Sequence, residues 1–60
     1  MDNQLPKDAV MLLSVVNTRL RDFYSDLDTF CENHTITKED LVSQLESIDY
    51  HYDPDSNQFI

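Results

Sequence analysis

Apolar residues recur at helical spacing over the first part of the chain. One stripe with a period of about 3.6 residues contains Ala9, Leu13, Val16, Leu20 and Phe23, with Leu12 and Tyr24 beside it. Asp8 directly precedes this stripe, and aspartate is a residue type that commonly caps the N-terminus of a helix. The pattern predicts a helix from Ala9 to about Phe23 whose apolar stripe faces the core.

Two shorter helices are predicted to follow. Ser25 is the N-cap candidate for a helix over about residues 26–33, and Asn33 is a residue type that tolerates the left-handed conformation at a helix end. Thr37 is the N-cap candidate for a third helix over about residues 38–47, in which Leu41 and Leu45 repeat on one side. The apolar positions of the second helix are Leu27, Phe30 and Cys31.

The last segment, about residues 50–60, has the pattern of a β-hairpin. Tyr50 and Tyr52 alternate with polar neighbours, and the turn sequence Asp-Pro-Asp-Ser follows at 53–56. Asn57 in a left-handed conformation would suit a hairpin loop with a bulge, and Phe59 would then lie opposite Tyr52. Because an isolated hairpin is marginally stable in water, Tyr50, Tyr52 and Phe59 are expected to cover the helices.

The element order predicts a fold that is mainly α with a small β-hairpin. We expect one compact three-helix domain over residues 1–60, closed by a C-terminal two-stranded hairpin, in an order like that of a winged helix-turn-helix. That order gives a second hypothesis, a winged-helix-like DNA-binding or transcription-regulatory protein. Its basic contacts would come from Lys7, Arg19 and Arg21 after dimerisation.

Charge makes nucleic acid and membrane poor candidates for a partner, and its simplest explanation is that it keeps a small protein soluble, with an acidic docking face for a basic partner as the alternative. The chain carries a net charge of −8, of which residues 1–21 contribute +1 and residues 22–60 contribute −9. An acidic surface repels phosphates and anionic lipid heads, so neither nucleic acid nor membrane is expected as a partner. A single cysteine, Cys31, fits a reducing compartment, and the first residues lack the features of a signal peptide. We therefore expect a cytoplasmic protein.

Four groups of polar side chains are candidates for chemistry, and each has a simpler structural explanation. Asp53, Asp55 and Asn57 imitate half of a calcium loop, yet a turn requires the same residue types. Cys31, His34 and His51 fall short of the four ligands of a structural zinc site. The carboxylate pairs available for acid and base catalysis are Asp26 with Asp28 and Asp53 with Asp55. Both pairs lie at predicted caps and turns, so we expect no metal, no cofactor and no enzymatic activity.

Val10, Met11 and Val15 are apolar residues that lie off the predicted core stripe of the first helix. They make the beginning of that helix apolar almost all round, and such a helix is either buried on every side or meets another chain. This predicts a small acidic protein-protein interaction module that associates with itself as a dimer, or with another protein, through these three residues. The alternative is coverage within the chain by Leu5, Pro6 and the hairpin.

The chain also resembles a known family. The stretches LPKDAVMLLSVVNTRLRDFYSDLDTFC and ITKEDLVSQLESIDYHYDPDSNQF are similar to an uncharacterised family of short bacterial proteins, a domain of unknown function. Ala9 stands where that family commonly has proline, and Asp49 stands where it commonly has glycine. The resemblance implies an intracellular stand-alone domain, and it assigns no functional residue.

Overall fold

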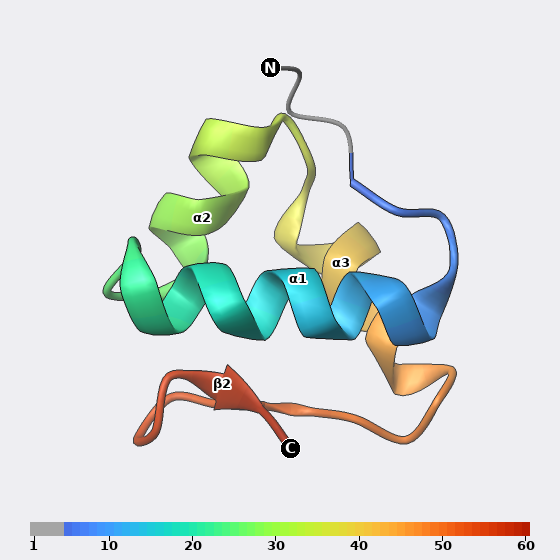
Figure 1. Cartoon of the computed structure of the whole chain (residues 1–60). Coiled ribbons are helices and arrows are strands. Elements are labelled where there is room, and N and C mark those ends of the chain that lie inside the picture. The colour runs from blue at the N-terminus through green and yellow to red at the C-terminus, as the bar shows by residue number, and fades with distance from the viewer. Residues whose placement is uncertain (1–4) are drawn as a thin grey trace.

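The computed structural model describes residues 5–60 and confirms the predicted fold class (Figure 1). Three helices are followed by a two-stranded antiparallel hairpin. Their bounds are α1 Ala9–Asp22, α2 Leu27–His34, α3 Lys38–Glu46, β1 Tyr52–Asp53 and β2 Gln58–Phe59. All the described helices are too short or too polar to cross a bilayer.

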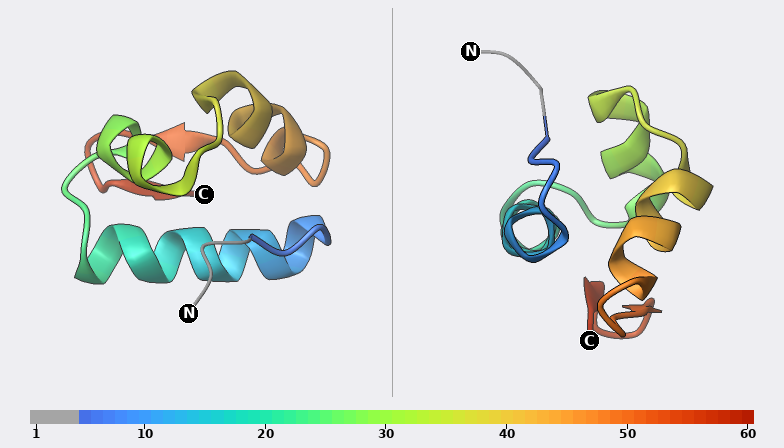
Figure 2. Two further views of the ribbon diagram at one scale, coloured as in Figure 1. Left: turned by 90° about the horizontal axis from the view of Figure 1, so that it is seen from above. Right: turned by 90° about the vertical axis from the view of Figure 1, so that its right-hand side faces the viewer.

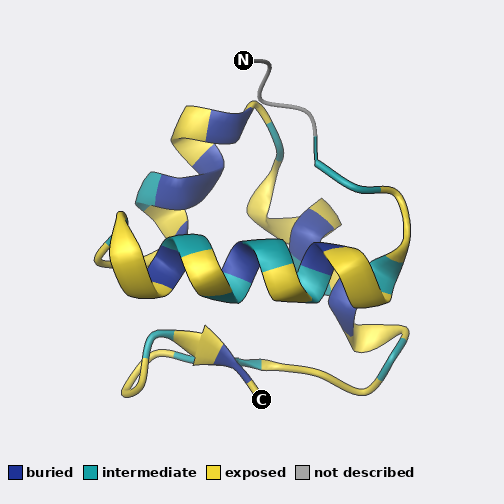
Figure 3. Cartoon of the chain, in the orientation of Figure 1, coloured by how far each residue is buried: buried dark blue, intermediate teal, exposed yellow. Residues whose placement is uncertain are grey.

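The elements lie in two layers. Helix α1 forms one layer by itself, and α2, α3 and the hairpin form the other (Figure 2). One long side of α1 therefore packs on the rest of the chain, while its opposite side faces away from it. Buried and exposed residues accordingly alternate along α1, as the dark and light segments in Figure 3 show.

One apolar core lies between the layers, and α1 contributes Leu12, Val16 and Leu20 to it. The remaining members of this core are Leu27, Phe30, Cys31, Leu41, Leu45 and Phe59. Leu12, predicted beside the stripe, is a core residue, whereas Leu13 is half-buried. The prediction for Phe23 is wrong, since its side chain is 73% exposed. Helix α1 ends at Asp22 and Phe23 is its C-cap, so Phe23 no longer follows the helical period.

Side-chain caps begin each helix, and two of the three were predicted correctly. Asp8 accepts a hydrogen bond from the Val10 amide, and Thr37 Oγ1 accepts one from the Asp40 amide at 3.1 Å. The prediction of Ser25 as the cap of α2 is wrong. Asp26 has the extended conformation of an N-cap and accepts from the Thr29 amide at 2.8 Å, so the helix begins one residue later than expected.

The end of α2 also differs from the prediction. The left-handed residue is Thr35, with φ of 53°, and not Asn33. The helix continues through buried His34, so the left-handed residue lies two positions later than expected. The Asn33 side chain instead donates a hydrogen bond to the Thr29 carbonyl one turn earlier. Asp49 after α3 also has positive φ, at 66°, in the left-handed region that favours glycine.

The hairpin has the predicted register, with Tyr52 opposite Phe59. His51 and Ile60 extend the ladder by exchanging two backbone hydrogen bonds of 2.8 Å. Asn57 has the predicted left-handed conformation, with φ of 54°. Tyr52 and Phe59 turn toward the helices, but the prediction that Tyr50 covers them is wrong, because its side chain is 38% exposed.

Candidate interaction surface

The side of α1 that faces away from the second layer carries exposed apolar side chains. Val10 is 62% exposed and Met11 is 58% exposed, whereas Val15 is half-buried at the margin. Successive residues turn by about 100° around a helix of 3.6 residues per turn, so Ser14 lies between Val10 and Met11 on this side. We call the exposed residues Val10, Met11, Ser14 and Thr18 the outer face of α1.

The described part of the N-terminal segment does not cover this face. Leu5 is half-buried and packs against the core cluster, next to a half-buried Pro6. Val10 and Met11 keep more than half of their surface exposed with Leu5 in that position. The two most exposed of the three candidate residues are therefore side by side in sequence and on one surface of the helix.

The outer face also lies in an uncharged part of the chain. No charged residue occurs from Ala9 to Thr18, which is the longest such run in the sequence. Two dipeptides of mixed sign flank this run on the exposed surface, Lys7-Asp8 before it and Arg21-Asp22 after it. Arg21 Nε and Asp22 Oδ1 form an ion pair of 2.9 Å, and the hydrogen bond from Arg21 lowers the pKa of Asp22.

A different side of α1 holds the hairpin through the side-chain amide of Asn17. Asn17 Oδ1 accepts a hydrogen bond from the Phe59 amide at 2.8 Å, and its Nδ2 donates to the Phe59 carbonyl at 3.0 Å. In this register the Phe59 backbone groups point away from β1, where a third strand would otherwise pair. One asparagine therefore satisfies both polar groups on the free edge of β2.

Asn57 holds the hairpin loop against the end of α1. Its Nδ2 donates to the carbonyls of Leu20 and Tyr24, at 3.1 and 3.0 Å. Its Oδ1 accepts from the Tyr52 hydroxyl at 2.6 Å, and burial raises the pKa of that phenol. Carbonyls near a helix C-terminus lack intrahelical donors, so Asn57 supplies a cap from a distant part of the chain.

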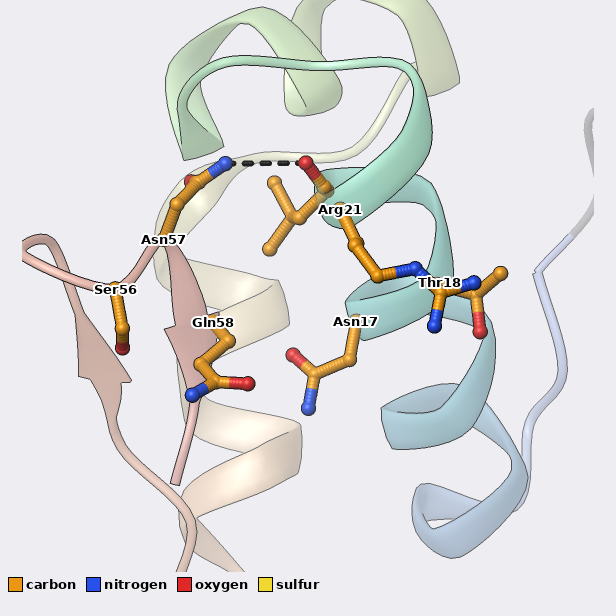
Figure 4. Close-up of a pocket in the computed structure, with 7 residues that line it drawn as sticks. Asn17, Thr18, Arg21, Ser56, Asn57 and Gln58 are labelled. Atoms are coloured by element: carbon orange, nitrogen blue, oxygen red, sulfur yellow. Dashed lines mark hydrogen bonds between the residues drawn. The ribbon is translucent and has the colours of Figure 1, made fainter.

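A shallow hollow of about 410 Å³ lies between α1 and the hairpin. Figure 4 shows Asn17 and Gln58 facing one another across it, with the bond from Asn57 to the Leu20 carbonyl at one end. The amides of Asn17 and Asn57 are already used on backbone groups of the same chain. The hollow is therefore better explained as the seam where the hairpin docks than as a ligand site.

Buried His34 forms part of the core and has hydrogen-bond partners on both ring nitrogens. Its ring stacks on Phe30 with centroids 4.2 Å apart and meets the Tyr24 ring edge to face. Nδ1 lies 2.9 Å from the Phe30 carbonyl oxygen and Nε2 lies 3.1 Å from Arg19 Nη1. A guanidinium only donates and a carbonyl only accepts, so these contacts fit a ring whose Nδ1 donates to Phe30 and whose Nε2 accepts from Arg19. Sequence reasoning placed His34 correctly at a helix end but missed its burial.

Cys31 and His34 have little freedom for the zinc chemistry considered from the sequence. Burial raises the pKa of the Cys31 thiol, while a metal ligand or nucleophile requires the thiolate. Within residues 5–60, no three histidine, cysteine, aspartate or glutamate side chains lie close enough together to share a metal ion.

The remaining carboxylate pairs have structural partners. Asp26 caps α2, and this hydrogen bonding from Thr29 lowers the pKa of its carboxyl group. Asp28 forms an exposed ion pair of 3.2 Å with Lys38. Asp53 accepts from the Asp55 amide at 3.2 Å and from the Ser56 hydroxyl at 2.8 Å, which holds the hairpin turn.

Comparison with known proteins identifies the family. Neither the curated proteins nor the solved structures include a match to this chain. The family model described as "Domain of unknown function (DUF4250)" matches residues 6–59. This confirms the resemblance noted in the sequence, and the chain belongs to the DUF4250 family.

Proposed function

We propose that this chain is a small protein-protein interaction module that meets its partner through the outer face of α1. The observation that carries the proposal is the exposure of Val10 and Met11, at 62% and 58%, on a helix whose other long side is packed. Half-buried Val15 borders them and extends the apolar surface toward the second layer. Burying such side chains against another chain would remove apolar area from water, which favours association.

The chemistry around the face supports a protein partner. Interface centres are poor in charged residues and contain methionine more often than the rest of a surface does. The outer face has that character, because its ten-residue sequence neighbourhood, residues 9–18, has no charge while the whole chain carries −8. A partner that binds here avoids the carboxylates, which are concentrated from residue 22 onward.

Nucleic acid is a poorer partner for this surface and for the others. Helix α3, which takes the place of a recognition helix, exposes Glu39, Asp40 and Glu46, and Lys38 is paired with Asp28. Arg19 contacts His34 and Arg21 contacts Asp22, so two of the three cations considered for DNA contacts have partners in the chain. Phosphate binding requires free cationic groups. We therefore propose no nucleic-acid partner. We also keep the expectations from the sequence that the protein is not an enzyme and is cytoplasmic.

The test is site-specific photocrosslinking in living cells. A benzoylphenylalanine at position 11 should give a covalent protein adduct, and the same probe at exposed Gln44 on α3 should not. Adding Val10→Glu should abolish the adduct at position 11 while the circular dichroism spectrum of the purified variant stays unchanged. No adduct at position 11, or identical adducts at both positions, would contradict the proposal.

A further inference from the structure

We infer that the occupant of the outer face of α1 is a second copy of this chain, packed antiparallel across a twofold axis that passes between Ser14 and Val15. This inference rests on the proposed function, because it uses the same face. It adds the identity of the partner and the direction of the two helices.

Net charge restricts where two copies can meet. Each copy carries −8, and residues 22–60 alone carry −9. Contact through α2, α3 or the hairpin would bring like charges together, which costs free energy and opposes association. The outer face is the one apolar exposed surface on a long uncharged segment of the described chain, so two copies meet there with the least repulsion.

The charges at the two ends of α1 then select the direction. Lys7-Asp8 precedes the uncharged run and Arg21-Asp22 follows it, and all four side chains are exposed. In an antiparallel pair centred between Ser14 and Val15, Lys7 of one copy lies level with Asp22 of the other. Asp8 lies level with Arg21 in the same arrangement, so both pairs are complementary and each occurs twice, in addition to the Arg21–Asp22 ion pair and the bond from the Val10 amide to Asp8 within each chain. A parallel pair would instead set each charge against its own kind.

The same centre covers the exposed apolar residues against the partner helix, opposite Thr18 and Arg19, without placing them against one another. Met11 of one copy lies level with Thr18 of the other, and the small Ser14 side chain sits at the crossing point. An antiparallel arrangement of this kind is isologous, so it closes at two copies and leaves no growing end. Opposed helix dipoles add to the preference for this direction.

The size of the face sets the strength of the contact. Helix α1 has 14 residues, and at 1.5 Å per residue it is about 21 Å long. One helix face of this length buries less than the roughly 800 Å² per partner that is usual in stable complexes. We therefore expect a reversible dimer with a dissociation constant in the range of about 10 µM to 1 mM.

A charge swap measured by analytical ultracentrifugation tests the pairing. Lys7→Glu alone and Asp22→Lys alone should each weaken dimerisation by about fivefold, since each change places like charges together twice. The double variant restores opposite charges and should return to within about twofold of wild type. Both positions are exposed, so the fold is retained. Additive weakening in the double variant would overturn the antiparallel arrangement.

Disulfide trapping tests the position of the axis independently. Ser14→Cys should form a linked dimer under mild oxidation, because two such residues at the crossing point come within disulfide reach. Gln44→Cys is the matched exposed control and should remain monomeric. Native Cys31 is buried and can stay in place. Equal trapping at both positions would contradict the inference.

The two proposals fail in different ways. A wild-type chain that stays monomeric near 1 mM would refute self-association. An adduct at position 11 that contains a different protein would, in that case, still support the interaction module. Loss of the position-11 adduct together with a monomeric wild type would refute both.

Discussion

The outer face of α1 and the hairpin side of the same helix differ in whether their side chains find partners within the chain. Asn17 on the hairpin side uses its whole amide on the Phe59 backbone, with bonds of 2.8 and 3.0 Å. Val10 and Met11 on the outer face remain more than half exposed. These two bonds give Asn17 a structural purpose. Val10 and Met11, which the sequence already placed off the core stripe, have no comparable contacts for their side chains within the described chain.

The two surfaces also differ in whether they are protected from contact with another chain. A free strand edge invites pairing with another chain, and Asn17 blocks that edge on β2 by taking the place of a strand. The outer face of α1 has no comparable protection within residues 5–60. The strand edge of the hairpin is therefore protected from other chains, whereas the outer face of α1 is exposed to them. This difference is expected if only the helix surface binds a partner.

The largest expected effect is on the hairpin side, at Phe59. This side chain is 2% exposed and lies 5.5 Å from the Tyr52 ring, measured between centroids. Phe59→Ala should cost about 3–5 kcal/mol because it removes an aromatic ring from the core. In a small domain this should leave most of the chain unfolded in a thermal melt followed by circular dichroism. Ile60→Ala, at the exposed next residue, is the control and should melt nearly as wild type does.

The next largest effect on stability is expected at Asn17, whose side-chain amide bonds the Phe59 backbone. Asn17→Ala leaves the amide and the carbonyl of Phe59 without partners on a part-buried edge, which should lower the free energy of unfolding by about 2–3 kcal/mol. Thr18→Ala, one residue further and exposed, should change it by less than about 0.5 kcal/mol. Equal urea midpoints for the two variants would mean that the Asn17 hydrogen bonds add nothing to the docking of the hairpin.

Local signals in the sequence were sufficient for much of the fold. Asp8 and Thr37 cap their helices as predicted, because an N-cap depends on a few neighbouring residues. The pairing of Tyr52 with Phe59 follows in the same way from the turn and its bulge at Asn57. Each of these features is decided within a short segment.

Several helix ends and the contacts between distant residues were not predicted correctly. Phe23 continues the apolar period, but the chain leaves the helix there, so its side chain is exposed. The N-cap of α2 is Asp26 where Ser25 was expected, and its left-handed stop is Thr35 where Asn33 was expected, so that His34 is part of the helix and buried. The partners of Asn17 lie 42 residues away in sequence. The available signal was an asparagine inside a helix, an unfavourable choice that usually has a tertiary reason.

A smaller effect is expected at the cap of α3, which lies in neither of the two compared regions. Thr37→Ala removes the acceptor for the Asp40 amide and should cost about 1 kcal/mol. Thr37→Ser keeps the hydroxyl and should melt close to wild type. An alanine variant with an unchanged urea midpoint would mean that the cap contributes no net stability, in contrast to the asparagine contacts.

The cap of α2 predicts a dependence on pH. Hydrogen bonding from Thr29 lowers the pKa of Asp26 in the folded protein, so folding favours the ionised form. This contribution is fully present above the unfolded pKa of about 3.9 and is lost as pH falls through the lower folded value. Melting temperature should therefore decline below about pH 4. Asp26→Asn keeps an acceptor without a titrating group, so its decline in the same pH series should be shallower; an identical decline would exclude Asp26 as a source.

The smallest expected effect on stability is at the outer face, and it tests the whole comparison. Val10→Gln with Met11→Gln replaces two exposed apolar side chains, and changes at exposed positions away from caps and buried contacts usually alter stability by less than about 0.5 kcal/mol. Leu12→Gln, a neighbouring change at a 1% exposed position, should unfold the chain and serves as the matched control. The double variant should melt at low concentration as wild type does and should lose the concentration-dependent sedimentation expected of the dimer. If it unfolds instead, the outer face is covered by its own chain, and the difference between the two sides of α1 has a structural origin with no bearing on partners.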